Sequence, residues 1–282
     1  MKKTISILLI LITFSINAQI TKPYHEKRLV DLKDKTMTYF VSPGGNNGKD
    51  FADVISKYWK ITPFKIITFD EIQNNLNPNN LFFADITNTL SDFNGANAHI
   101  SSFGYQMWSP TQKMIDANKE NKKLEFKFYE QFYEIKMEGD YWYAGFFKNF
   151  LQQIQDNMKA LKATGKAEDV ADPSKIAELK NNTLYVPNYI LKKDEKAEEM
   201  FSKYSNKYQM ISSQDLNKKI MAGENIYYML TCIYGQNCKI INVINSQTGQ
   251  LVYSSYEIKP IYPYLRKNDI AAIDKEIGKA AK

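Results

Sequence analysis

Two stretches of this chain carry the same order of predicted strands and helices, and this internal repeat limits the folds that the chain can adopt. The second copy is the clearer one. Residues 183–258 predict a strand (TLYVPNYIL), a helix (EKAEEMFSKYSNKY), a second strand (QMIS), a short helix, a third strand (IYYMLTCI) and a hairpin (KIINVIN, then QLVYSSYEI). The earlier part of the chain repeats this order.

The two copies agree in register as well as in order. Each predicted helix has apolar residues at i, i+3, i+4 and i+7, so each offers one apolar stripe to a sheet. The matched positions are Phe51, Val54, Ile55 and Tyr58 with Ala197, Met200, Phe201 and Tyr204; Thr36-Met37 with Thr183-Leu184; Ile66-Ile67 with Met210-Ile211; and Leu81-Phe82-Phe83 with Ile226-Tyr227-Tyr228. The alternative is a single α/β domain whose units look alike because amphipathic helices between strands share one pattern.

The repeat predicts an α/β fold with mixed sheets (α+β), built from two tandem modules of strand-helix-strand-helix-strand-hairpin-helix order. We expect a flexible start at residues 20–29, the first module at 30–164 and the second at 178–282. The polar segment 165–177, broken by glycine and proline, is the expected linker. Residues 87–121 have no counterpart of equal length and are expected to form a loop, a strand and a connecting helix.

Residues 1–19 have the pattern of a secretory signal peptide. Two lysines precede an apolar run from Ile5 to Ile16, and Ala18 lies near the expected cut. The run is too short to cross a membrane, and no other stretch is long enough. No cysteine lies near the cut. We therefore expect a protein of the periplasm or the cell exterior that is not a lipoprotein and has no transmembrane segment after cleavage.

The charge of the chain is mild and scattered. Cleavage after residue 19 leaves 35 basic and 31 acidic residues, a balance of +4. Nucleic-acid binding needs a concentrated basic stripe, so we do not expect a nucleic-acid partner. The chain has 16 Phe and 19 Tyr residues, and such aromatics commonly fill half-buried sheet positions.

A glycine-rich loop, SPGGNNGKD, separates the first predicted strand from the helix that starts near Asp50. Free backbone amides at a helix start can cradle an anion, so Gly44, Gly45, Gly48 and Lys49 are a candidate anion loop. The phosphate-loop pattern needs one more residue between its glycines and a Ser or Thr where Asp50 stands. The alternative is a permissive turn with Asp50 as the helix cap.

The aromatic run Tyr141, Trp142 and Tyr143 opens a long helix, because the apolar residues from Phe147 to Leu161 keep helical spacing. These three aromatics are a candidate surface for a sugar or a partner helix. The alternative is packing in the core.

The two cysteines, Cys232 and Cys238, flank IYGQN at a predicted hairpin. In an exported protein this spacing favours a disulfide over a metal pair, since Gly235 suits a tight turn and no histidine is near.

The second hairpin carries a resemblance. The stretch IINVINSQTGQLVYSS, with its Thr-Gly turn before an apolar strand, resembles the hairpin of envelope modules such as the TolB amino-terminal domain, the curli-channel protein family and the lipoprotein activators of penicillin-binding proteins. In those families a strand, a helix and a strand precede the hairpin, as LYVPNYIL, the Met200 helix and QMISSQDLN do here. The resemblance implies an α/β envelope module. This chain lacks a lipid-attachment cysteine, and no propeller follows.

The sequence offers no pattern for catalysis, a cofactor or a metal. The only histidines, His25 and His99, have no ligand-spaced partner, and no Gly-x-Ser-x-Gly elbow occurs. We expect a non-catalytic envelope protein whose modules bind another protein or peptidoglycan. The alternative is a ligand-binding protein or hydrolase with a pocket between the modules.

Overall fold

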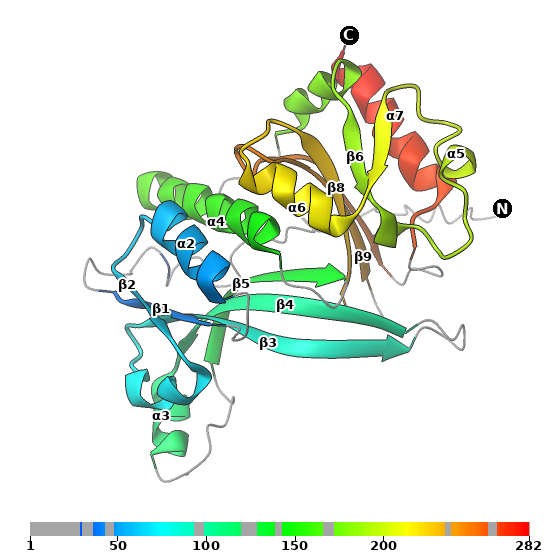
Figure 1. Ribbon diagram of the computed structural model, residues 1–282. Coiled ribbons are helices and arrows are strands. Elements are labelled where there is room, and N and C mark those ends of the chain that lie inside the picture. The colour runs from blue at the N-terminus through cyan, green and yellow to red at the C-terminus, as the bar shows by residue number, and fades with distance from the viewer. Residues whose placement is uncertain are drawn as a thin grey trace, which may run out of the picture.

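The computed structural model describes residues 29, 36–42, 48–92, 99–119, 129–138, 143–165, 172–234, 238–258 and 264–281. It contains two five-stranded sheets, ordered β2-β1-β3-β4-β5 and β10-β9-β8-β6-β7. In each sheet the first strand lies between two parallel neighbours, and two antiparallel strands follow (Figure 1). The fold is therefore α/β with two similar modules, as the repeat predicted.

The N-terminal module has helices on one face of its sheet and shorter elements on the other. Helices α2 (Gly48–Tyr58) and α4 (Ala144–Thr164) lie side by side over the sheet (Figure 1). The strands are β1 (Thr38–Val41), β2 (Phe64–Ile67), β3 (Leu81–Asp92), β4 (His99–Pro110) and β5 (Tyr129–Glu138); the short elements are η2 (Phe69–Glu71), η3 (Gln73–Asn75) and α3 (Gln112–Asn118).

The C-terminal module repeats this plan. Helix α7 (Lys267–Ala280) packs with η4 (Pro173–Lys180) on one face of the sheet, and α6 (Ser213–Met221) packs on the other face. The strands are β6 (Leu184–Pro187), β7 (Tyr208–Ile211), β8 (Tyr227–Tyr234), β9 (Cys238–Asn245) and β10 (Leu251–Ile258); η5 (Asn188–Ile190) and α5 (Ala197–Met200) follow β6.

Strand pairing places the two copies in register. Ile66 pairs with Phe40 in the first sheet, and Met210 pairs with Val186 in the second, as the sequence match requires. The third strands are one residue off the prediction. Leu81 pairs with Thr38, the first residue of the central strand in the first sheet. Tyr227 pairs with Leu184, the first residue of the central strand in the second sheet. Leu81 therefore corresponds to Tyr227 and not to Ile226. The match of Thr36-Met37 with Thr183-Leu184 is off by one residue in the opposite direction, because Leu184 corresponds to Thr38.

Two predicted elements differ in length. The helix expected through Tyr208 ends at Met200, because the backbone N–H and the Oγ of Ser205 donate to the carboxylate of Asp274, at 2.8 Å and 3.0 Å, and draw the chain toward α7. In the insertion 87–121, β3 and β4 each run for 12 residues, against eight in β8 and β9. Much of the expected loop is therefore hairpin, and Figure 1 shows this hairpin extending past the other strands of its sheet.

One apolar core runs through both modules. It joins residues of α2 and α4 and the helix-covered face of the first sheet to α6 and the facing side of the second sheet. Phe146 of α4 packs against Tyr228 of β8, with ring centres 5.6 Å apart. Helix α4 is consequently buried on two sides and belongs to the packing of both modules.

A second core lies on the far face of the second sheet, under α7 and η4. Ile176 and Leu179 of η4 are buried in it. The backbone N–H of Asp172 also donates to the carbonyl oxygen of Leu251 at 2.8 Å. The C-terminal part of the segment expected as a linker is therefore packed structure that begins at Asp172.

Candidate functional site

The predicted site residues lie only partly within the described structure. Gly44 and Gly45 lie outside it, whereas Gly48 and Lys49 form the first turn of α2 and Lys49 is exposed. The helix starts two residues before Asp50, so Asp50 lies in the first turn and is not the cap. The candidate anion loop stays a prediction.

The candidate aromatic surface also lies only partly within the described residues. Tyr141 and Trp142 lie outside the described residues. Tyr143 is half-buried against the shared core and meets the ring of Phe146 edge-on, with ring centres 5.5 Å apart. For Tyr143, core packing is the better interpretation.

The strand register does not favour the predicted disulfide, which stays a prediction. Cys232 pairs with Ile240, and Cys238 pairs with Tyr234. The two cysteines are thus diagonal neighbours, which in antiparallel strands lie about 7–8 Å apart. A disulfide usually needs Cα atoms about 4.4–6.8 Å apart, so the register would have to shift.

The joint between the modules is where the structure brings polar side chains together, and the sequence did not point to it. Its central feature is a reciprocal exchange between α4 and α6. The backbone N–H of Gly145, in the first turn of α4, donates to Oδ1 of Asn217 at 2.7 Å. In return, Nζ of Lys148 donates to the carbonyl oxygen of Ile220, in the last turn of α6, at 3.2 Å. Asn217 thus satisfies a free amide at the start of α4, and Lys148 places a cation at the C-terminal end of α6, where the Ile220 carbonyl also accepts from the Gly223 N–H at 3.1 Å.

The same helix holds the Ser246–Gly249 turn of the C-terminal module. Lys148 Nζ and Asn149 Nδ2 donate to the carbonyl oxygen of Ser246, at 3.1 Å and 2.7 Å. Gln152 donates to the carbonyl oxygen of Gln247, and Gln153 to that of Gly249. The polar side chains along this stripe of α4 therefore bind one turn of the C-terminal module.

Gly249 is the closest point of this contact. Its φ is +76°, a backbone conformation that favours glycine. A Cβ atom there would lie 2.7 Å from the backbone oxygen of Asn149 and 3.0 Å from Cβ of Gln152. The Thr-Gly motif that carried the resemblance thus serves the packing of the turn against α4.

Lys148 is a buried cation without a carboxylate partner in the described part of the chain. Only 3% of the residue is exposed. Its burial lowers its pKa, and the nearby charge of Lys57 lowers it further. The two carbonyl oxygens at the joint, together with the ring of Tyr58 5.5 Å away, supply the negative potential that holds the ammonium group.

A charge cluster around the buried Lys239 fastens α7 to its sheet. Nζ of Lys239 lies 2.8 Å from Asp269 and 3.3 Å from Glu257, and Arg266 contacts the same two carboxylates. Burial raises the pKa of Asp269, but hydrogen bonds from Arg266 and Lys239 outweigh it and leave that pKa below its usual value. Every charge in this cluster is paired, so its role is structural.

The described residues contain no group of three or more His, Cys, Asp or Glu side chains placed to hold a metal ion. Within the same ranges, no helix is long and apolar enough to cross a membrane. Searches against family models, curated proteins and solved structures found no match. The resemblance to envelope modules stays a prediction.

Proposed function

We propose that the protein is an exported, non-catalytic envelope protein whose tandem α/β modules bind another protein or the cell wall. The observation that carries this proposal is the construction of the joint. An inter-module pocket would need polar groups turned toward a ligand, but Lys148, Asn149 and Gln153 are turned toward the carbonyl oxygens of a turn.

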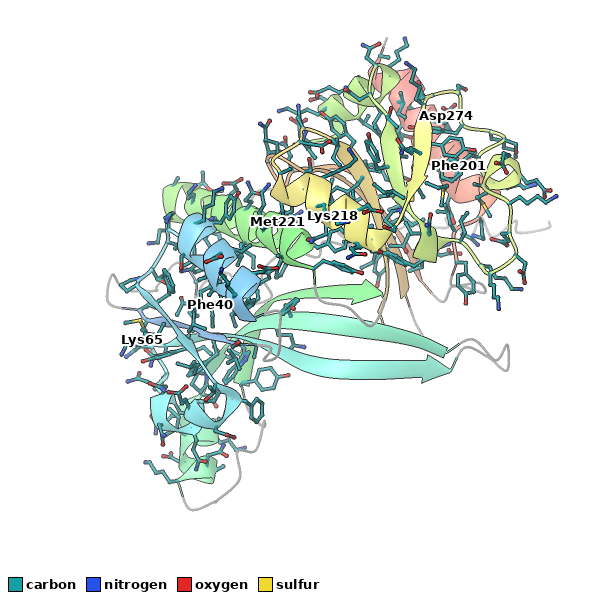
Figure 2. All side chains as sticks on the ribbon, viewed as in Figure 1. Phe40, Lys65, Phe201, Lys218, Met221 and Asp274 are labelled. Carbon is teal, nitrogen blue, oxygen red and sulfur yellow. The ribbon has the colours of Figure 1, made fainter. Side chains whose placement is uncertain are left out.

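The shared core supports the same conclusion. Because α4 is packed on both sides, the two modules form one body whose outer surfaces are the parts available to a large partner. Large apolar side chains are exposed on those surfaces at Ile66, Phe69, Met221 and Tyr256. Figure 2 shows Met221 on α6, beside Lys218.

The test is capture by the immobilised mature chain, residues 20–282, from its own envelope extract, with sedimentation on purified peptidoglycan in parallel. We expect a stoichiometric protein or wall partner, and mass spectrometry separates it from further copies of this chain. Binding to neither, together with binding or turnover of a small molecule, would contradict the proposal.

A surface variant makes the test specific. Trp142→Ala removes the centre of the predicted aromatic surface, and its melting temperature is measured first. Loss of capture at unchanged melting temperature would assign partner binding to this surface. A collapse of the melting temperature would assign Trp142 to the core and direct the search to the other exposed apolar side chains.

A further inference from the structure

The outer side of β3 has an open backbone edge along residues 84–92, which we call the β3 edge. On its other side, β4 pairs with β3 throughout this stretch, apart from a bulge after Asp85. β1 pairs only with residues 81–83, and no further described strand joins β3 on that side. In the view of Figure 1, β3 is the strand of the long hairpin that lies away from the C-terminal module. Within the described structure, the β3 edge is thus paired on one side only.

The strand register shows which backbone groups of β3 point to β4. The backbone N–H of Leu81 donates at 2.9 Å to the chain just before β1, so it points away from β4. Because backbone groups alternate between the two sides of a strand, those of Ala84 point to its β4 partner, Gln106. Gly104 lies on the same side of β4 as Gln106, and its partner in β3 is Thr87. Beyond the bulge, Thr87 and every second residue after it therefore bond to β4.

The residues between these, Asn88, Leu90 and Asp92, turn their backbone groups to the open side. Each carries one N–H and one C=O, so the β3 edge offers donors and acceptors at the spacing that an added strand needs. Natural edge strands are commonly protected by lysine or proline. The stretch 84–92 reads ADITNTLSD and contains neither. Its bulge lies before Asn88, so the open groups from there onward form an uninterrupted template for a further strand.

The charge of this stretch indicates what binds there. Its only ionisable residues are Asp85 and Asp92, one near each end. A basic segment complements both acids, whereas a second copy of the β3 edge brings only further acids to the contact. We propose that the β3 edge binds an extended segment of a partner protein, with basic residues at its ends, as an added strand of the N-terminal sheet. This inference rests on the proposed function and assigns its partner to a protein that binds by strand addition.

Proline substitution tests strand addition directly. Proline lacks an N–H and is tolerated in a strand where that N–H faces outward, so Leu90→Pro should keep the melting temperature and lose the added strand. The matched control Leu90→Ala keeps the N–H, and Asn88→Pro repeats the test at the neighbouring open position if Leu90→Pro melts early. The probe is a fluorescent peptide of alternating threonine and valine with lysine at both ends. Residues 20–282 should bind it, about tenfold more weakly after Leu90→Pro and equally tightly after Leu90→Ala.

Capture from the envelope extract is the second readout. A protein captured by the wild type and by Leu90→Ala, but not by Leu90→Pro, would support the inference. Equal capture by all three would overturn it and leave the proposed function standing. Capture by none, with probe binding that Leu90→Pro weakens, would contradict the proposed function alone. The inference would also be overturned by a wild type that does not bind the probe, by equal binding of a probe with glutamate in place of lysine, or by a dimer in sedimentation velocity that Leu90→Pro dissociates.

Discussion

Substituting Gly249 by alanine tests the joint between the modules by adding a single methyl group. Two costs are expected. A residue with a side chain held at a φ of +76° loses about 1–2 kcal/mol. The new methyl group also meets the backbone oxygen of Asn149 at 2.7 Å, and forcing a group into packed structure costs about 1–3 kcal/mol. Gly249→Ala should therefore destabilise the protein by about 2–5 kcal/mol.

Gly223→Ala is the matched control. Its φ is +79°, nearly the same as that of Gly249, but nothing lies within 4 Å of the position that its Cβ would take. It should cost only the backbone part, about 1–2 kcal/mol. The effect of a glycine-to-alanine change on the unfolded chain is shared by both variants and cancels in their difference.

Urea unfolding followed by circular dichroism gives the two free energies of unfolding. We expect Gly249→Ala to be less stable than Gly223→Ala by about 1–3 kcal/mol. Equal losses in the two variants would mean that the Ser246–Gly249 turn does not rest on α4, and the account of the joint would fail with it.

Further predictions concern Lys148, Asp269 and the cysteines. Because folding lowers the pKa of Lys148, the unfolded chain holds this proton more tightly than the folded chain does. The stability of the wild type relative to Lys148→Met should therefore rise with pH up to about 10.4. Parallel stability–pH profiles of the two proteins would contradict this. The depressed pKa of Asp269 adds stability above a pH of about 3.9 that is lost as pH falls through the folded pKa, so Asp269→Asn should be less stable at neutral pH and show a shallower acid transition in urea midpoints. Alkylation without reduction should label both Cys232 and Cys238, and an intact disulfide by mass spectrometry would show that the ladder shifts in the oxidised protein.

The repeat and the order of its elements could be predicted from the sequence, because helices and hairpins leave clear periodic patterns. The register of the third strands could not. Phe82 and Phe83 are both buried, on opposite faces of the first sheet, and Tyr227 and Tyr228 are buried in the same way in the second. A strand that is apolar on both faces gives no alternation to fix its position, so a one-residue error leaves no trace in the pattern.

The polar contacts of the joint could not be predicted from the sequence, for a different reason. Lys148, Asn149, Gln152 and Gln153 follow helical spacing and read as the solvated face of an amphipathic helix. Their partners are backbone carbonyl oxygens of a turn far along the chain, and carbonyl groups carry no sequence signature. The one sequence signal for the joint was the glycine of the Thr-Gly turn, because a close approach of two backbones at a positive φ requires glycine at that position.

The same comparison distinguishes the joint from the two ends of the described repeat. In the second module, Leu216, Asn217 and Ile220 of α6 receive α4 from the first. The corresponding residues of the first module are Ile72, Gln73 and Leu76. Ile72 and Leu76 share a core with Met114 of α3, and Gln73 donates to the carbonyl oxygen of Asn118.

Helix α3, supplied by the insertion, thus occupies in the first module the place that α4 occupies in the second. At the other end, α7 buries Ile270, Ile273 and Ile277 on a single face, whereas α4 is buried on two. Repeat arrays that stack indefinitely need each unit to offer one uncovered face to the next. Here one end is covered from within its own module and α7 presents a polar helix face, so neither end of the described residues repeats the apolar surface that α6 offers to α4.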